Sequence, residues 1–274
     1  MIVILSESIM GVNALLNRAE ILEIENYNGI NIYKVKLENT LPFLIVISGY
    51  GKVNTARAIQ YVDQKYCIEK LIVTGNAAVL ESTEADFGTV AISTTAFQYD
   101  VDFTALGEEA YAFPNQEEFR YPADQTLITR AQTAAIVAGE TAVTGVYATA
   151  DTFLTDAAPV TELIATDAQF VDTNAADAGQ VAYFNEIPYV VIKGIANTAG
   201  ATAVAEYNAN VTEANANANE VVYQMLVALI GIPEQETTPR CQRNNCMSNQ
   251  TISWNGCNGC NNGFNTWNRF WWGA

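Results

Sequence analysis

Ser48-Gly-Tyr-Gly-Lys-Val-Asn-Thr-Ala56 joins a short β-branched run, Phe43–Ile47, to a stretch with apolar residues at helical spacing, Val53–Tyr66. This strand, turn and helix set the pattern for the rest of the chain. Similar apolar runs predict buried strands at Ile2–Leu5, Leu71–Val73, Val90–Ile92, Val143–Tyr147 and Tyr189–Ile192. Helical spacing recurs at Gln125–Ala138, Val160–Thr166, Asp177–Phe184 and Val211–Leu229. The alternation predicts an α/β fold around a mixed or largely parallel sheet.

The glycine turn has two interpretations. Because it opens a helix, its backbone N–H groups could cradle a phosphate. Gly49 and Gly51 are equally well explained as turn glycines that support the sheet.

The composition excludes several classes of protein. Of 274 residues, 50% are hydrophobic and 16% are charged, so the chain can bury a sizeable core and is not a disordered tail. Its net charge of −17 opposes binding to nucleic acid or to an anionic membrane surface. The absence of His excludes His-dependent triads and zinc proteases. We expect no cofactor, no signal peptide and no membrane span, since no apolar run is long enough to cross a bilayer.

The composition changes near Gly231, where the alternation of strands and helices stops. We predict a main domain at 1–232 and an irregular C-terminal extension at 233–274. From Pro239 onward the chain has three Arg and no acidic residue, and it holds all four Trp and four of the five Cys. An acidic body and a basic, aromatic extension are electrostatically complementary, within one chain or between neighbouring chains.

The spacing of the cysteines in the extension leaves three alternatives. Cys241, Cys246, Cys257 and Cys260 form two close pairs that could bind one zinc ion. The Asn- and Gly-rich setting suits disulfides, within the chain or between subunits, and free thiols are the third option. We favour disulfides, and we expect Cys67, at the end of a predicted helix, to be a small buried hydrophobic residue.

Four segments in order form the basis of a family resemblance. They are the turn at 48–56, Ile72-Val-Thr-Gly-Asn-Ala-Ala78, Asp100-Val-Asp-Phe-Thr-Ala-Leu-Gly107 and Val190-Val-Ile-Lys-Gly-Ile-Ala196. With them, the chain up to about residue 230 resembles the methylthioadenosine/S-adenosylhomocysteine nucleosidases of the purine nucleoside phosphorylase superfamily. The resemblance implies a three-layer α/β/α domain with a central mixed sheet, a dimer or trimer, and cleavage of the N-glycosidic bond of adenine nucleosides.

The residues that this resemblance assigns to catalysis differ from the family pattern. It places Val12 where the family has a Glu that positions water, Asn174 where a Glu holds the ribose hydroxyls, and Asn197 where an Asp protonates the purine. Val12 is apolar, and neither amide titrates. Each positioned acid or base contributes about 10²–10⁴ in rate, so we expect a degenerate, catalytically inactive member.

Some ligand-binding residues are retained in the resemblance. The set it implies is Phe153, which would stack on adenine, with Asn76, Asp172, Asn174 and Asn197. Glu7, directly after the first predicted strand, is the one acid that could replace the missing Glu, but we expect an exposed loop carboxylate there.

The hypotheses of function differ in what they require of the extension. The preferred one is a self-assembling structural subunit of a filament, appendage or surface layer, which associates through the family dimer face and through Trp254, Trp267, Phe270, Trp271 and Trp272. A fold-back of these aromatic residues within one chain is the alternative. The second hypothesis is a nucleoside-binding pseudoenzyme or a residual adenosine-type nucleosidase, and the third is a regulatory module with a zinc knuckle. Cross-linked cysteines favour an extracellular or spore-surface location over the cytoplasm.

Overall fold

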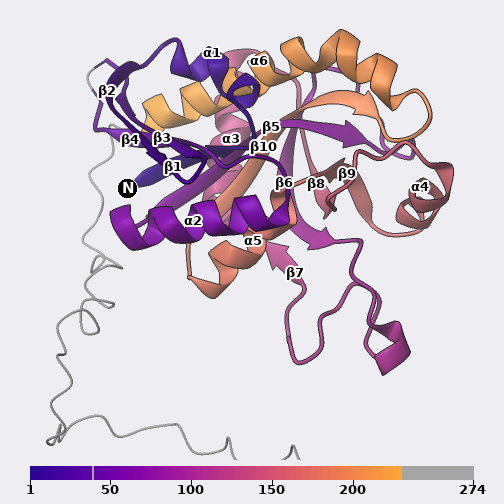
Figure 1. Cartoon of the computed structure of the whole chain (residues 1–274). Helices are drawn as coiled ribbons and strands as arrows, with labels where there is room; N and C mark the ends of the chain where they lie inside the picture. The colour runs from indigo at the N-terminus through magenta and orange to yellow at the C-terminus, as the bar shows by residue number, and fades with distance from the viewer. Residues whose placement is uncertain (39, 230–274) are drawn as a thin grey trace, which may run out of the picture. The chain divides into compact units, whose positions relative to one another are not determined.

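The strands of the structure, a computed structural model that describes residues 1–38 and 40–229, form one mixed sheet (Figure 1). They are β1 (Ile2–Ser6), β2 (Glu20–Tyr27), β3 (Ile30–Lys36), β4 (Phe43–Ile47), β5 (Lys70–Val79), β6 (Val90–Gln98), β7 (Arg120–Pro122), β8 (Ala142–Thr149), β9 (Ala168–Asp172) and β10 (Tyr189–Thr198). Their order is β10-β6-β8-β9-β5-β1-β4-β3-β2, with β7 paired to β6.

The sheet curls back on itself at one end, because β10 pairs with both β6 and β5. Strands β4, β1, β5 and β10 run parallel to one another. Strand β9 runs antiparallel to β5, and Ala78 of β5 is opposite Val171 of β9. The end of β9 and the second half of β5 therefore lie side by side.

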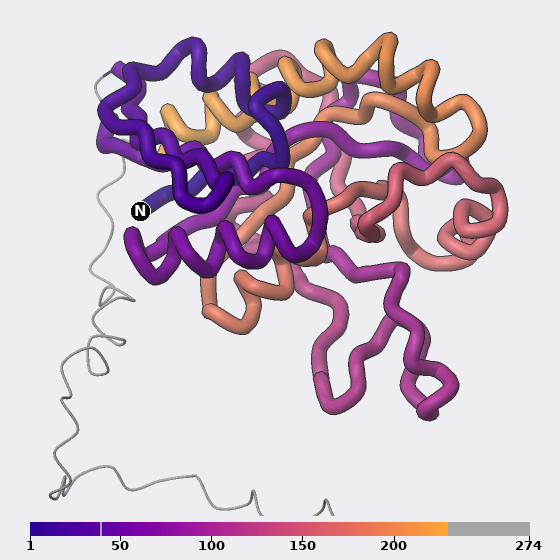
Figure 2. The backbone as a smooth tube through the Cα atoms, viewed as in Figure 1, coloured from indigo at the N-terminus to yellow at the C-terminus, as the bar shows by residue number. Residues whose placement is uncertain are grey.

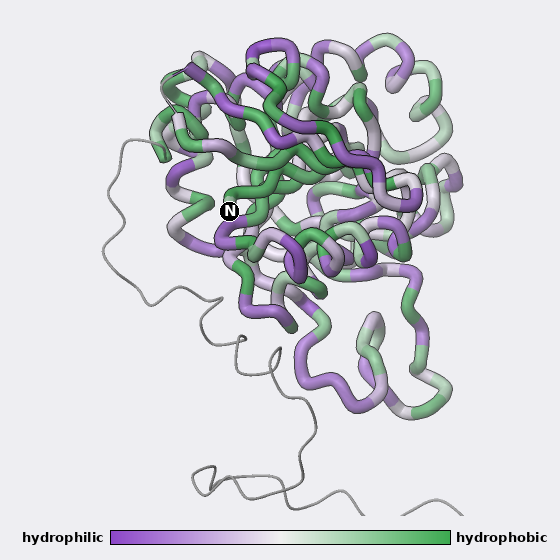
Figure 3. Tube along the Cα trace, turned by 60° about the vertical axis from the view of Figure 1, so that its left-hand side comes forward, coloured by the Kyte–Doolittle hydropathy of each residue, from purple (hydrophilic) through white to green (hydrophobic). Residues whose placement is uncertain are grey.

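Helices cover both faces of this sheet. They are α1 (Asn13–Leu16), α2 (Lys52–Tyr66), α3 (Gln125–Ala138), α4 (Ala157–Ile164), α5 (Ala175–Phe184) and α6 (Ala203–Leu229), with short 3-10 turns at Ile9–Gly11 and Thr104–Leu106. Side chains alternate along each strand, so Val3 packs in a core cluster with α2 and α5, whereas Ile4 packs in another with α1, α3 and α6. The arrangement has the three α/β/α layers that the sequence predicts, with the most hydrophobic stretches in its central strands (Figure 3).

The predicted apolar runs all fall within observed strands, and every predicted helix overlaps an observed one. Strands β2, β3, β7 and β9 are additional. Figure 2 shows that the segment between β6 and β7 extends away from the sheet. The predicted boundary at residue 232 falls beyond the last described residue and stays a prediction.

Two predictions about single features can be compared with this part of the chain. Cys67 is half-buried rather than buried. It follows the last residue of α2 with a φ of 57°, and its carbonyl accepts a hydrogen bond from the amino group of Met1. Among the described residues, none of the helices is long and apolar enough to cross a membrane.

Candidate functional site

A pocket of about 460 Å³ opens where the ends of β1 and β9 and the loop after β8 meet the second half of β5. Four of the five ligand-binding residues predicted from the sequence line it, namely Asn76, Phe153, Asp172 and Asn197. The fifth, Asn174, is fully buried behind the wall. The acidic side chains in the wall are Glu7, Asp151 and Asp172, and the described residues that line the pocket include no Lys or Arg.

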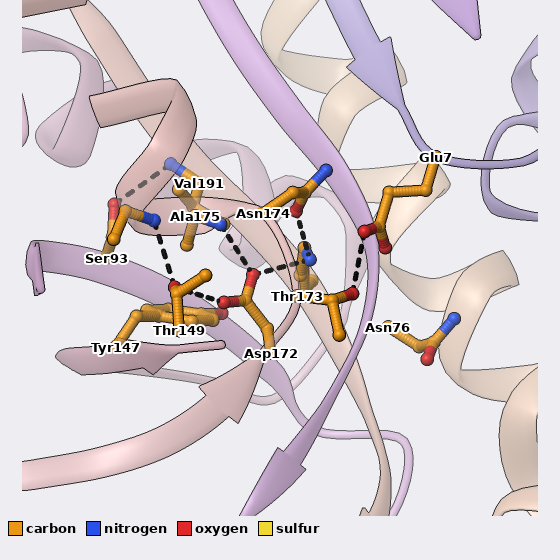
Figure 4. Close-up of polar contacts among 12 residues, drawn as sticks. Glu7, Asn76, Ser93, Tyr147, Thr149, Asp172, Thr173, Asn174, Ala175 and Val191 are labelled. Carbon is orange, nitrogen blue, oxygen red and sulfur yellow. Dashed lines mark hydrogen bonds and ion pairs between the residues drawn. The ribbon is translucent and has the colours of Figure 1, made fainter. Parts of the chain in front are cut away.

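Glu7 is part of this pocket, which corrects the expectation of an exposed loop carboxylate. Its side chain is held by Thr173, whose Oγ1 donates a hydrogen bond of 2.7 Å to Oε1 of Glu7 (Figure 4). Burial raises the pKa of Glu7, while the nearby charge of Lys193 and the bond from Thr173 lower it in part. The sequence gives no sign of this burial, since Thr173 lies 166 residues away along the chain.

Val12 stands at the position where the family pattern has its water-positioning Glu, and it supplies no acid to the pocket. Its side chain is fully buried and packs in the core cluster of α3 and α6. It therefore has no access to a water molecule in the pocket.

A buried ion pair forms the base of the pocket wall. Lys193 of β10 is 1% exposed, and its Nζ donates to Oδ2 of Asp172 and to Oδ1 of Asn174, both at 2.6 Å (Figure 4). The other carboxylate oxygen of Asp172 accepts a bond of 2.6 Å from Thr149, and Oδ2 also accepts one from the backbone N–H of Ala175 at the start of α5. Asp172 therefore has two roles: it caps the N-terminus of α5, and it neutralises the buried charge of Lys193.

Asn174 is committed to this network rather than to a ligand. Because Lys193 can only donate, its bond requires the amide oxygen of Asn174, which directs the amide nitrogen elsewhere. Within the described part of the chain, that nitrogen is buried without a hydrogen-bond partner.

Asn197 reaches the pocket from an irregular part of β10. The register of β10 against β5 shifts between Ile195 and Asn197, a bulge that re-aims the side chain. One amide N–H of Asn197 donates to the carbonyl of Thr198 at 3.0 Å. On the neighbouring strand β5, Asn76 donates to Asn215 of α6 at 3.4 Å.

Three aromatic residues line the pocket, namely Tyr50, Phe153 and Tyr207. Phe153 is 46% exposed and meets the ring of Tyr207 edge to face, with 5.5 Å between centroids and 86° between planes. Phe153 keeps a ring surface that a planar ligand can cover, as its motif predicts.

Asp151 occupies the position at which the glycine turn could have cradled a phosphate. Its Oδ1 accepts a bond of 2.8 Å from the backbone N–H of Lys52, the first residue of α2. Gly51 has a φ of 96°, and a Cβ there would lie 3.2 Å from the same oxygen of Asp151. A carboxylate therefore already serves the N-terminus of this helix, which disfavours a phosphate at that end.

Asp177 is a buried acid that the sequence does not single out. It lies in the first turn of α5 and is 3% exposed, and neither carboxylate oxygen has a hydrogen-bond partner among the described residues. Burial raises its pKa to about 8, with a further contribution from Asp172 and a smaller opposing one from Lys52. It does not line the pocket, but it adds a titratable group beside the buried ion pair.

The residues predicted to act in the C-terminal extension lie outside the described residues. These are Cys241, Cys246, Cys257 and Cys260, and the assembly residues Trp254, Trp267, Phe270, Trp271 and Trp272. Within residues 1–38 and 40–229, no group of three or more acidic, Cys or His side chains is placed to hold a metal ion.

Comparison with known proteins places the chain in one family. Residues 2–230 match the phosphorylase superfamily. A 5'-methylthioadenosine/S-adenosylhomocysteine nucleosidase of Haemophilus ducreyi is 31% identical, over 77% of this chain and 90% of its own length. The chain belongs to the methylthioadenosine/S-adenosylhomocysteine nucleosidase family of the phosphorylase superfamily. The corresponding protein of Staphylococcus carnosus is 28% identical, over 73% of this chain and 87% of its own.

Solved structures of nucleosidases share the fold at lower sequence identity. The enzyme of Neisseria meningitidis, in complex with methylthio-immucillin-A, has a TM-score of 0.78 at 24% identity, covering 83% of this chain and 98% of its own. The enzyme of Colwellia psychrerythraea, in complex with adenine, has a TM-score of 0.79 at 24% identity, covering 85% and 97%. A futalosine hydrolase of Helicobacter pylori also has a TM-score of 0.78, at 18% identity, covering 83% of this chain and 97% of its own.

Proposed function

We propose that this pocket binds a nucleoside and hydrolyses its N-glycosidic bond, with Glu7 as the carboxylate that acts on water. The observation that supports this most is the place of Glu7 in one pocket with Phe153 and Asn197. Its relatives are named as nucleosidases, and a protein with the same fold has been solved in complex with adenine, so both support the same class of ligand.

The chemistry of the reaction needs negative charge on the sugar side. When the bond from C1' to the base nitrogen breaks, positive charge develops on the ribose ring, and fixed carboxylates stabilise it. Among the described residues Glu7 forms no ion pair, and its hydrogen bonds come from the hydroxyl of Thr173 and the backbone of Gly51. An ionised Glu7 can therefore take the proton of a water molecule as that water attacks C1'.

Hydrolysis is favoured over phosphorolysis by the charges of the pocket. Three of its lining residues are acidic, and Asp151 already holds the N-terminus of α2. An inorganic phosphate would meet repulsion there without a basic side chain to offset it.

The burial of Glu7 in the pocket favours the nucleosidase hypothesis over the inactive protein that the sequence predicts. Inactivity was expected because three family carboxylates are absent, and the residues at those positions are indeed Val12, Asn174 and Asn197. A further carboxylate in the pocket now supports the alternative hypothesis of a nucleosidase. The self-assembly hypothesis relies on the family dimer face and on residues beyond 229, which lie outside the described residues, and it stays a prediction.

The test is calorimetry and product analysis on the full chain. We expect heat of binding with adenine or 5'-methylthioadenosine at up to millimolar ligand, and release of free base from at least one nucleoside in a panel that varies the base and the 5' group. No heat and no free base from any member would contradict the proposal.

A further inference from the structure

The pocket combines negative charge with aromatic surface. This combination indicates the charge of the ligand, which the fold alone does not. Glu7 and Asp151 contribute carboxylates to its wall, and the charge of the third lining acid, Asp172, is offset by its ion pair with Lys193. Phe153 and Tyr207 present rings at the same wall. Carboxylates together with aromatic faces are the surroundings that stabilise a delocalised organic cation.

Among the described lining residues, the position where the family pattern has a purine-protonating Asp holds an amide, Asn197. Both carboxylate oxygens of Asp172 are occupied as acceptors, by Lys193, Thr149 and the N–H of Ala175. Asp151 accepts a hydrogen bond from the N–H of Lys52 at the start of α2. Asn197 presents an amide, which has no proton to transfer at neutral pH.

These two observations lead to one substrate class. We propose that the pocket selects nucleosides whose base carries a positive charge before the glycosidic bond breaks, such as N7-alkylated purine or N-ribosylpyridinium compounds. The inference rests on the proposed nucleosidase function and specifies its substrate.

The reaction then balances without an acid. The bond between C1' and the cationic ring nitrogen breaks, and its electron pair goes to that nitrogen, so the base leaves as a neutral molecule. A water oxygen bonds to C1', and the proton of this water goes to the Glu7 carboxylate and then to solvent. A neutral purine, in contrast, leaves as an anion unless a group protonates it, and that protonation typically contributes about 10²–10⁴ in rate.

The experiment uses pairs of probes that differ in charge. Guanosine and 7-methylguanosine form one pair, and the reduced and oxidised forms of N-ribosylnicotinamide form the second, so that a methyl group and a charge are tested separately. Dissociation constants come from calorimetry, and turnover comes from chromatography of the free base, with the uncatalysed rate subtracted. We expect the cationic member of each pair to bind at least about tenfold more tightly and to turn over at least about 100-fold faster.

Three variants separate the effect of charge in the pocket from the effect of a substitution elsewhere in the chain. Glu7→Gln removes the carboxylate and should reduce turnover of the cationic probes by about 100-fold or more. Glu162→Gln makes the same change on an exposed face of α4, outside the pocket, and should leave turnover unchanged. Asn197→Asp supplies an acid, and we expect it to raise turnover of guanosine far more than that of 7-methylguanosine.

The outcomes distinguish this inference from the function on which it rests. If guanosine binds and reacts as well as 7-methylguanosine, the charge preference is wrong while the nucleosidase function stands. If no probe of either pair binds and 5'-methylthioadenosine also fails, the proposed function is wrong, and the charge preference falls with it. Preference for both cationic probes, lost in Glu7→Gln alone, would support the inference.

Discussion

Thr173 Oγ1 donates a hydrogen bond of 2.7 Å to Oε1 of Glu7, and this bond ties the loop after β1 to the end of β9. It gives a carboxylate on a loop a fixed place in the pocket. It also opposes the effect of burial, which raises the pKa of the same group.

Thr173→Val should therefore move the pH dependence of turnover. Without the hydroxyl, the pKa of Glu7 rises further, because a bond that favours the ionised form is lost. If ionised Glu7 is the base, turnover rises with pH through this pKa, and the variant should need a more alkaline pH for the same rate. Thr161→Val, on an exposed face of α4, is the matched control for pH–rate profiles. An unchanged pH–rate profile in Thr173→Val would show that ionisation of Glu7 does not determine the pH dependence of turnover.

Asp177 predicts a dependence of stability on pH. Its pKa is about 8 in the folded chain against an ordinary value of 3.8, so the folded state binds a proton that the unfolded state lacks between about pH 4 and 8. Stability should fall as pH rises through this window. Between pH 6 and 9 the fall attributable to Asp177 should be about 3 kcal/mol in the free energy of unfolding.

Urea unfolding at the two pH values measures this effect. Asp177→Asn should show a smaller fall than the unmodified chain and should be the more stable protein at pH 9. Asp86→Asn, in an exposed loop, should behave like the unmodified chain. Equal falls in all three proteins would show that Asp177 is not protonated in the folded state at neutral pH.

The buried ion pair predicts a large loss of stability when one partner is removed. Lys193→Met leaves the Asp172 charge buried without a counter-ion, which typically costs about 3–5 kcal/mol. Adding Asp172→Asn removes that charge, so the double variant should lose less than the sum of the two single losses. Lys36→Met, which breaks an exposed pair with Glu20, should cost less than about 1 kcal/mol. Strict additivity in the double variant would contradict this account of the pocket wall.

Gly51 and Gly139 offer a comparison of two glycines with positive φ. A Cβ at Gly51 would lie 3.2 Å from Asp151, whereas one at Gly139 would meet nothing within 4 Å. Gly139→Ala should cost about 1–2 kcal/mol from backbone strain alone. Gly51→Ala should cost more and should also weaken ligand binding, because Asp151 must shift. Thermal unfolding measures the loss of stability in the two variants, and calorimetry with the most tightly bound probe measures the loss of affinity. Equal losses in Gly51→Ala and Gly139→Ala would contradict the role given to Asp151.

Much of the fold was predictable because its central strands are buried on both faces. The run Phe43–Ile47 has five buried residues and is β4 with the same bounds as predicted. Strand β2 was missed because most of its residues are exposed and glutamates interrupt its apolar residues. It is held by pairing with β3 rather than by a hydrophobic face of its own.

The site was harder to predict because contacts between distant residues define it. The motif around Phe153 does lead to the pocket, and so does Asn197. The environments of Glu7 and Asp177 depend on Thr173, Asp172 and Lys193, which meet only in the folded chain. No local pattern in the sequence marks a carboxylate that burial alone makes reactive.

The most direct test of the central claim is a comparison of free base released from nucleosides by the unmodified chain, Glu7→Gln and Glu162→Gln. The account predicts hydrolysis by the unmodified chain and by Glu162→Gln, and a loss of about 100-fold or more in Glu7→Gln with the ligand still bound. Equal rates in all three proteins, or no free base from the unmodified chain with any nucleoside, would contradict it.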